Sequence, residues 1–382
     1  MYFIIFIYFL FISIIYTQKV ECKINTTSTE ECPLIIRNLY LDIVFVFDSS
    51  YGANEHGFTG QLLSISGFLN SGFIIEQGNK IQSTRVSYIS MASKTLTFSN
   101  LTTYNSVNEA ISGLYELSFN ANTGPIVNLY SGLMAANNQL DMFKRDGFKQ
   151  LIVIFSSETE VDCSESTEML YQNSSLNIEN PCRAASIIKS EGKDILVVNL
   201  NYHDAPPPEI KHIASPNYDI PNDDNLIGNL QKLASYSNCN CPKSYTQFTD
   251  IELNFKGRTC AYFEDSTTFY YVAVQKIQGI DSRLIQIRSE IKQKFAKSLC
   301  EKDDCFFGLN QLNESGKWKW DGSDIDFNPK EYDNFGPGEE KKIGCGYIEN
   351  TTGKWFSTDC HTVEKKYAIE ILACDTENFC LL

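Results

Sequence analysis

A run of five apolar residues between Asp42 and Asp48 constrains the fold of this chain more than any other feature. An uninterrupted apolar run of this length is typical of a strand buried on both faces of a parallel sheet. Further apolar runs at 85–92, 150–155 and 194–200 predict three more strands. The segments between these runs have helical periodicity, which indicates a parallel sheet wrapped by helices, an α/β domain.

The spacing of apolar residues also places the helices of this domain. They are expected at 58–75, 107–117, 129–143, 183–191 and 226–236, with a short one at 209–214 after three consecutive prolines.

The pattern changes at residues 237–242, where helical periodicity stops and short strands framed by cysteines begin. A chain of 382 residues can bury two cores, so we expect the α/β domain at 38–238 and an α+β domain at 239–382. Helices are expected at 269–277 and 290–299 in the second domain. No long flexible linker separates the two halves, and the domains should therefore sit against each other.

The first 17 residues are almost wholly apolar, and polar residues begin at Gln18. This pattern predicts a secretory signal over residues 1–18, cleaved near 17–19, and hence a secreted, extracellular protein. The segment has no basic start, so an uncleaved signal anchor is the alternative. All 13 cysteines follow it, as expected in an oxidising compartment. Five sequons predict N-glycosylation, at Asn25, Asn100, Asn173, Asn313 and Asn350.

Charge and motif content exclude several classes of function. The net charge of -15 argues against a nucleic-acid partner, which requires clustered Lys and Arg. The four histidines are too scattered for a zinc site. The chain has no nucleophile elbow, no phosphate-binding glycine loop and no helical His-Glu-x-x-His motif. We therefore expect no enzymatic activity and no cofactor.

The first domain resembles a von Willebrand factor type A domain, in its strand and helix order and in the turn after Asp48. In this family a divalent cation is held by an Asp-x-Ser-x-Ser turn, a Thr and a second Asp. Asp48 and Ser50 match the first two positions. The other three positions fall on Gly52, Val127 and Ser157. The resemblance therefore implies a remnant of a metal site, because a hard cation needs several oxygen ligands.

Two neighbouring residues leave a working metal site open as an alternative. Thr123 and Glu158 lie close to the mismatched positions, and the register inferred from one sequence is uncertain by a few residues. Otherwise Asp48 and Ser50 are expected to serve as hydrogen-bonding residues of the turn at the end of the strand.

The second domain resembles a C-type lectin-like domain, and the match covers about 140 residues. The residues 306–309, Phe-Phe-Gly-Leu, resemble the Trp-Ile-Gly-Leu core motif of this family. Trp318 and Trp320 follow, and we expect them in the core rather than stacked on a sugar. The usual cysteine of the first helix falls near Ile277 and its usual partner near Ile369 or Glu370, so both members of one bridge are lost together.

Sugar binding in the lectin family uses a calcium ion held by a Glu-Pro-Asn type motif and a Trp-Asn-Asp motif. Only Glu339 matches the first motif, and Lys341 stands where an amide is usual. The second motif contains Phe356 and Ser357 in place of both ligands. The resemblance therefore implies no calcium-dependent sugar binding, and Glu339 is expected to be a solvated loop acid.

Three disulfides are expected from loop position and from the lectin resemblance: Cys163–Cys182, Cys241–Cys260 and Cys345–Cys360. Cys300, Cys305, Cys374 and Cys380 should form two more bridges, with three possible pairings. Because 13 is odd, one cysteine should be left over, and Cys239 is the best candidate.

The order of the two domains resembles a family of nematode secreted lectin-like proteins. That resemblance implies extracellular recognition of protein or glycan ligands, including microbial surfaces in innate defence. The alternative is a structural or matrix-adhesion glycoprotein that assembles through its type A domain and the odd cysteine.

Overall fold

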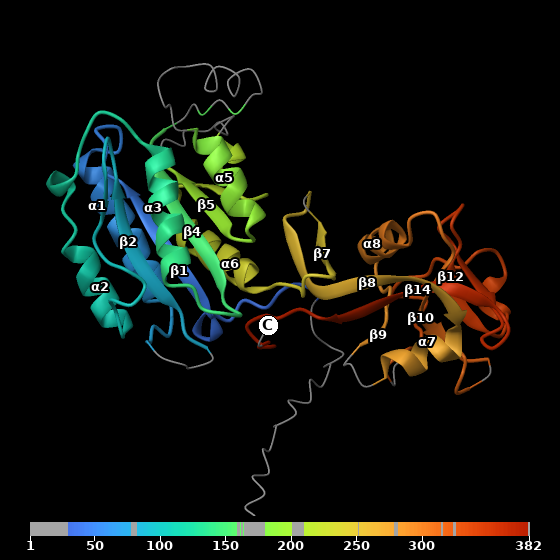
Figure 1. Cartoon of the computed structure of the whole chain (residues 1–382). Helices are drawn as coiled ribbons and strands as arrows, with labels where there is room; N and C mark the ends of the chain where they lie inside the picture. The colour runs from blue at the N-terminus through green and yellow to red at the C-terminus, as the bar shows by residue number, and fades with distance from the viewer. Residues whose placement is uncertain are drawn as a thin grey trace, which may run out of the picture.

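The computed structural model describes residues 30–77, 82–158, 161, 163, 180–200, 210–250, 252–278, 282–314, 316–323 and 326–380. They form two sheets, one in each half of the chain, with helices packed on both (Figure 1). The expected signal segment, Asn25 and Asn173 lie outside the described residues. Among the described residues, no helix is long and apolar enough to span a membrane.

The first sheet has six strands in the order β3-β2-β1-β4-β5-β6. All neighbours are parallel except β3, which pairs antiparallel with β2 at one edge. Every residue of the central strand β1 is buried, because strands pair with it on both edges and helices cover both faces. The strands are β1 (Leu41–Asp48), β2 (Arg85–Met91), β3 (Thr95–Thr97), β4 (Lys149–Ser156), β5 (Asp194–Asn199) and β6 (Asp219–Pro221).

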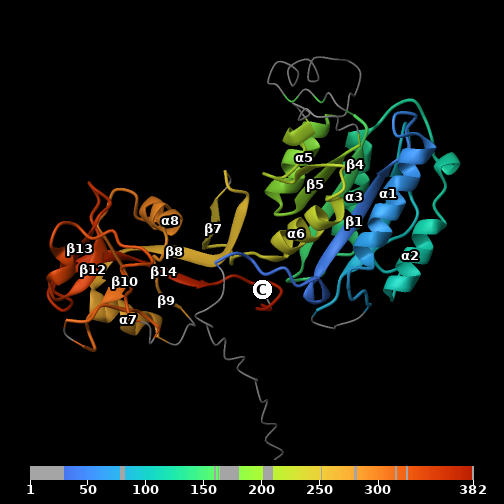
Figure 2. The ribbon, with the colours of Figure 1, turned by 180° about the vertical axis from the view of Figure 1, so that it is seen from behind.

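Helices cover both faces of this sheet, as the α/β pattern predicted. Helices α1 and α6 pack together on one face, and α3 and α5 pack together on the other (Figures 1 and 2). The helices are α1 (Asn54–Leu69), α2 (Val107–Tyr115), α3 (Leu129–Met142), α5 (Pro181–Ser190) and α6 (Leu226–Asn238), with short 3₁₀ helices η1 (Ile36–Asn38), η2 (Phe119–Ala121) and η3 (Ile210–His212).

The bounds predicted for the first helix, 58–75, are wrong at both ends. The helix begins at Asn54. The side-chain Oδ1 of Asn54 accepts hydrogen bonds from the backbone N–H groups of His56 and Gly57, which have no partner within the first turn of the helix. It ends at Leu69, because the chain turns at Gly72, where φ is +115°. Ile75 lies beyond the turn and pairs with Thr84 as an isolated bridge.

The second sheet has eight strands, with the main path β13-β12-β10-β14-β8-β7 and with β11 and β9 paired to β10 and β14. Two helices, α7 (Tyr270–Ile277) and α8 (Glu290–Cys300), and the 3₁₀ helix η4 (Glu339–Lys341) complete the domain. The strands are β7 (Thr246–Asp250), β8 (Phe255–Phe269), β9 (Arg283–Leu284), β10 (Cys305–Asn310), β11 (Lys319–Trp320), β12 (Cys345–Ile348), β13 (Trp355–Thr358) and β14 (Glu364–Leu372).

Aromatic side chains form the core of the second domain. Trp318, Trp320 and Trp355 are all buried, so the two tryptophans of the 318–320 segment belong to the core, as expected. Glycine is required at position 308 of the core motif for a steric reason, because a Cβ there would lie 2.6 Å from the carbonyl oxygen of Leu284. Ile277 and Ile369 share one apolar cluster, which agrees with the joint loss of a bridge at these positions.

The segment before the first sheet crosses to the second domain. Glu31 pairs with Gly257 of β8, and the backbone N–H of Cys32 donates to the carbonyl oxygen of Lys256 at 2.9 Å. Near the C-terminus, the Thr376 hydroxyl donates to the carbonyl oxygen of Pro33 at 3.0 Å. The N-terminal segment, the end of α6 and the C-terminal segment therefore meet at one junction between the two sheets.

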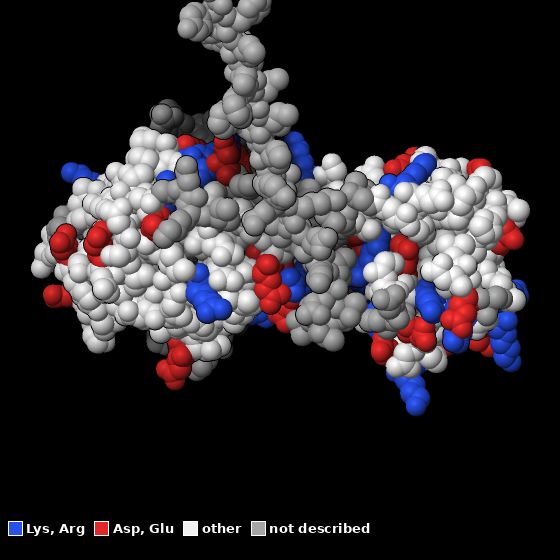
Figure 3. All heavy atoms as spheres, turned by 90° about the horizontal axis from the view of Figure 1, so that it is seen from below, with Lys and Arg blue, Asp and Glu red and all other residues white. Residues whose placement is uncertain are grey.

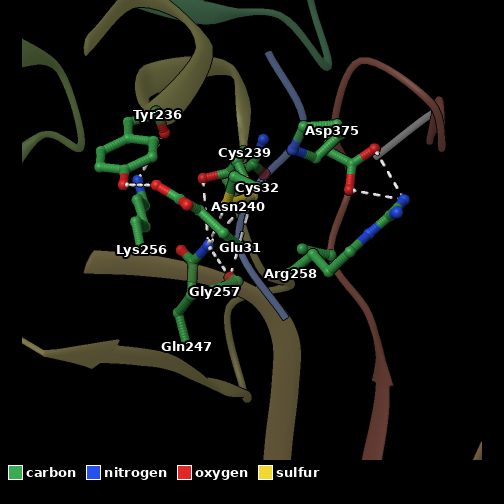
Figure 4. Close-up of a disulfide and its surroundings, with 12 residues drawn as sticks. Glu31, Cys32, Tyr236, Cys239, Asn240, Gln247, Lys256, Gly257, Arg258 and Asp375 are labelled. Carbon is green, nitrogen blue, oxygen red and sulfur yellow. Dashed lines mark hydrogen bonds and ion pairs between the residues drawn. A yellow bond between two sulfur atoms is a disulfide. The ribbon is translucent and has the colours of Figure 1, made fainter. Parts of the chain in front are cut away.

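The described cysteines form six disulfides: Cys32–Cys239, Cys163–Cys182, Cys241–Cys260, Cys300–Cys305, Cys345–Cys360 and Cys374–Cys380. Three of them join the cysteines that the sequence analysis paired. The assignment of Cys239 as the odd thiol is wrong, because Cys239 is bonded to Cys32 at the junction (Figure 4). Assembly through Cys239 is therefore excluded, and the remaining cysteine, Cys22, lies outside the described residues.

Candidate functional site

Asp48 lies at the carboxyl end of β1, where the type A family binds its cation, and both oxygens of its carboxylate accept hydrogen bonds from the protein itself. Its Oδ1 accepts a hydrogen bond from the Ser50 backbone N–H at 2.8 Å. Its Oδ2 accepts from both the backbone N–H and the hydroxyl of Ser157, each at 2.6 Å. Asp48 has no solvent exposure, so these donors replace both water and a cation.

Ser157 also fills the space that a complete metal motif would need. A Cβ at Gly52 would lie 2.6 Å from the Ser157 hydroxyl oxygen, so a serine at position 52 would require the Ser157 side chain to move. The hydroxyls of Ser50 and Ser157 lie 3.2 Å apart. The site has therefore closed around internal hydrogen bonds.

The other candidate ligands do not complete the site. Val127 is half-buried and packs against the core of the first domain. Thr123 is exposed next to Gly124, whose carbonyl oxygen accepts from the Tyr51 N–H at 2.8 Å. The backbone N–H of Glu158 donates to the Ser156 hydroxyl at 3.0 Å. Within the described part of the chain, no three His, Cys, Asp or Glu side chains cluster as a metal site.

Glu339, in η4, is buried, so its interpretation as a solvated loop acid is wrong. Its Oε2 accepts from the Ser357 backbone N–H at 3.1 Å and from the Ser357 hydroxyl at 3.0 Å. Its Oε1 is paired with the Lys342 ammonium. Burial alone would raise the pKa of Glu339, but the hydrogen bonds from Lys342 and Ser357 outweigh it and hold the pKa below its ordinary value.

Among the described residues, the positions beside Glu339 where the family has its other calcium ligands carry no carboxylate or amide side chain. Phe356 lies beside Gly336, where a Cβ would approach its ring to 2.9 Å, and its ring is 6.1 Å from that of Tyr347. Lys341 is exposed. One carboxylate that already holds a cation does not fit an ion requiring 6 to 8 oxygens.

The two remnants share one chemical arrangement. In each, a serine stands at a position where the family has an aspartate, and its N–H and hydroxyl both donate to the remaining carboxylate. A carboxylate that would bind a cation is thereby stabilised without one. Neither site fits the metal ion that its family would suggest.

A third buried carboxylate was missed by sequence reasoning. Glu370 in β14 is almost fully buried and pairs with Arg283 at 2.8 Å and with Lys292 at 3.1 Å. Glu370 is distant in sequence from both Arg283 and Lys292, so only its position beside the lost cysteine could have drawn attention to it. The pairing links β14 to β9 and α8.

Three of the predicted glycosylation positions lie among the described residues. Asn313 is exposed at the edge of a cavity of about 550 Å³ in the second domain. Asn100 and Asn350 are half-buried. The Asn100 side chain accepts from the N–H and hydroxyl of Thr102, whereas the Asn350 carbonyl oxygens accept from Lys297.

Two family models match the chain. The von Willebrand factor type A domain matches residues 42–233, and the lectin C-type domain matches residues 270–369. The low affinity immunoglobulin epsilon Fc receptor of Mus musculus is 29% identical over 140 residues, which are 35% of this chain and 38% of the receptor. The hepatic lectin of Gallus gallus is 31% identical over 121 residues, or 30% of this chain and 56% of the lectin. The chain thus spans well under two thirds of either relative.

Similar solved structures divide between the two domains. Proximal thread matrix protein 1 from the mussel byssus, with a zinc-occupied MIDAS motif, is 16% identical with a TM-score of 0.41, covering 52% of this chain and 47% of that chain. The carbohydrate-recognition domain of the mouse scavenger receptor C-type lectin is 23% identical with a TM-score of 0.29, covering 35% of this chain and 96% of that chain.

Proposed function

Because the chain belongs to the von Willebrand factor type A family and carries a C-type lectin domain after its type A domain, we propose that it is an extracellular recognition protein that binds its ligand without a metal ion. One observation carries this proposal. In Asp48 and in Glu339, the remaining acids of the two family metal sites, both carboxylate oxygens are engaged by internal donors.

The ligand is a protein or a glycan. Both kinds of recognition occur among the similar proteins, since one is named as a lectin and the other as a receptor for an immunoglobulin. Secretion is part of the proposal and is supported by the apolar start of the sequence and by six disulfides. Recognition of microbial surfaces in innate defence rests on the nematode resemblance alone.

The test is a glycan and microbial-surface binding screen of the secreted protein, read in calcium and again in excess chelator. We expect any binding to survive chelation and to be unchanged in Glu339→Ala. Glu340→Ala, which removes an exposed acid from the adjacent position, is the matched control. A signal that requires calcium and disappears only in Glu339→Ala would overturn the proposal.

A further inference from the structure

A cavity of about 380 Å³ lies between the two domains, beside the junction that Cys32–Cys239 closes. The first domain lines it from the starts of β4 and β5 and from the end of α5, and the second domain lines it from β7 and β8. Figure 4 shows three of its residues around the disulfide, Asn240, Gln247 and Lys256. Its volume lies within the range of small-molecule sites in proteins.

The charges that line this cavity are unusual for so acidic a protein. Four lysines line it, Lys149, Lys189, Lys193 and Lys256, against one carboxylate, Asp194. The chain as a whole carries a net charge of -15. The surface in Figure 3 carries acidic and basic residues side by side, without a patch of one sign. The cavity therefore concentrates positive charge in a protein that is otherwise negative.

Among the described residues, no acid forms an ion pair with three of the four ammonium groups. Lys193 is the exception, because it pairs with Asp141 at 2.6 Å and with Glu191 at 2.7 Å. Lys189 donates to the carbonyl oxygens of His212 and Ala214, at 2.9 and 3.0 Å. Lys256 donates to the carbonyl oxygen of Tyr236 at 2.7 Å. Lys149 has no hydrogen-bond partner for its side chain among the described residues.

Burial makes these charges costly in the absence of a ligand. Desolvation lowers the pKa of Lys189. It also lowers the pKa of Lys256, and the negative charge of Asp194 offsets this lowering only in part. An ammonium has three donors, so Lys256 keeps two that an incoming acceptor can use. A bound anion would offset the uncompensated charge.

The cavity also offers an acceptor for a hydroxylated molecule, the side chain of Asn240. Asn240 is buried, and its Oδ1 has no hydrogen-bond partner, although its Nδ2 donates to the carbonyl oxygen of Asn238 at 3.0 Å. A buried carbonyl oxygen without a donor is unfavourable. A ligand hydroxyl would satisfy it, whereas a bare inorganic anion would not.

We propose that this cavity binds a small hydroxylated anion of the size of an acidic monosaccharide, with the anionic group at Lys149, Lys189 and Lys256 and a hydroxyl at Asn240. Both domains contribute to the site, so its occupation would hold them together. The proposal does not depend on the sugar-binding face of the lectin domain and stands even if the proposed function fails.

The test is titration calorimetry of the full secreted chain at constant ionic strength. The probes are glucuronate and glucose 6-phosphate, which separate a carboxylate from a phosphate source, with glucose and sulfate as the neutral and non-hydroxylated comparisons. We expect at least one of the two sugar anions to bind more tightly than sulfate, and glucose not to bind. Lys149→Gln should weaken binding about tenfold, as for loss of one charged hydrogen bond, and Lys149→Glu should abolish it.

Lys144→Gln and Lys144→Glu are matched controls, because Lys144 is exposed on the same domain and does not line the cavity. Lys189→Gln provides a second reduction of cavity charge if the Lys149 variants fail to fold. Absence of binding by both sugar anions, equal binding by wild type and Lys149→Glu, or equal binding of sulfate and both sugar anions would each overturn the proposal. Glu339→Ala should leave this binding intact, which separates the site from that of the glycan screen.

Discussion

Ser157 donates two hydrogen bonds to the buried carboxylate of Asp48 in the first domain. Because the serine hydroxyl donates to a buried carboxylate, Ser157→Ala should lower the free energy of unfolding by about 1.5–3 kcal/mol. Thermal melting measures this, with Ser190→Ala as the control, since Ser190 is exposed and donates to a helix carbonyl. Magnesium should shift the melting temperature of neither wild type nor variant. Equal melting of Ser157→Ala and Ser190→Ala would contradict the role given to Ser157.

Glu339 should make the second domain sensitive to acid. Its pKa in the folded state lies below the ordinary value of 4.5, so its contribution to stability is complete above that value. The contribution is lost as the pH falls through the folded pKa, because protonation removes the acceptor for Ser357 and Lys342. Glu339→Gln should therefore destabilise the protein at neutral pH and match wild type in strong acid.

Melting curves from neutral pH down to about pH 3 measure this difference. Glu340→Gln is the control, as an exposed acid one residue away. A constant gap between wild type and Glu339→Gln across this range would mean that Glu339 acts by packing and not by charge.

The Cys32–Cys239 bridge should be the most stabilising of the six, because it joins residues separated by 207 positions. Chain entropy assigns a loop of that size about 5 kcal/mol, against about 2 kcal/mol for the loop closed by Cys374–Cys380, whose separation is 6. The paired substitutions Cys32→Ser with Cys239→Ser should therefore lower the melting temperature more than Cys374→Ser with Cys380→Ser. Calorimetry of both variants decides this, and equal losses would show that the junction is held by its backbone contacts instead.

Strands and helices of the first domain could be read from the sequence because their signals are local. The apolar runs beginning near Asp42 and Gln150 coincide with β1 and β4, since a strand buried on both faces must be apolar throughout. The start of α1 was missed because it depends on a side-chain cap from Asn54 and not on periodicity. Burial of Glu339 was missed for a similar reason, as its partner Ser357 lies on another strand.

The pairing of Cys239 could not be predicted, because short loops are the default expectation and Cys32 is distant in sequence. The pairing becomes evident only in the folded protein, where the segment before the first sheet and the end of α6 meet at the junction. The order of the two families was visible in their motifs and is confirmed by both family matches. The cavity between the domains has no sequence signature, since its four lysines come from three separate segments, near residues 149, 189–193 and 256.

The two halves of the chain should remain joined after a cut at the exposed residue Lys243. Cys241 lies before this cut and Cys260 after it, so their bridge spans the break. A protease site engineered between Lys243 and Ser244 should give one band on a non-reducing gel and two fragments after reduction. Cys241→Ser with Cys260→Ser is the control, and it should release two fragments without reduction under denaturing conditions. Separation of the halves before reduction would show that Cys241 is paired elsewhere.

The junction also determines how the protein would carry tension. A pull on the chain at Glu30 passes through Cys32 directly to Cys239 and on to the second sheet, so the 207-position loop between them is bypassed. The strands of the first domain then bear no load while the bridge is intact. Reduction of this single bond would place the whole type A domain in the path of the force.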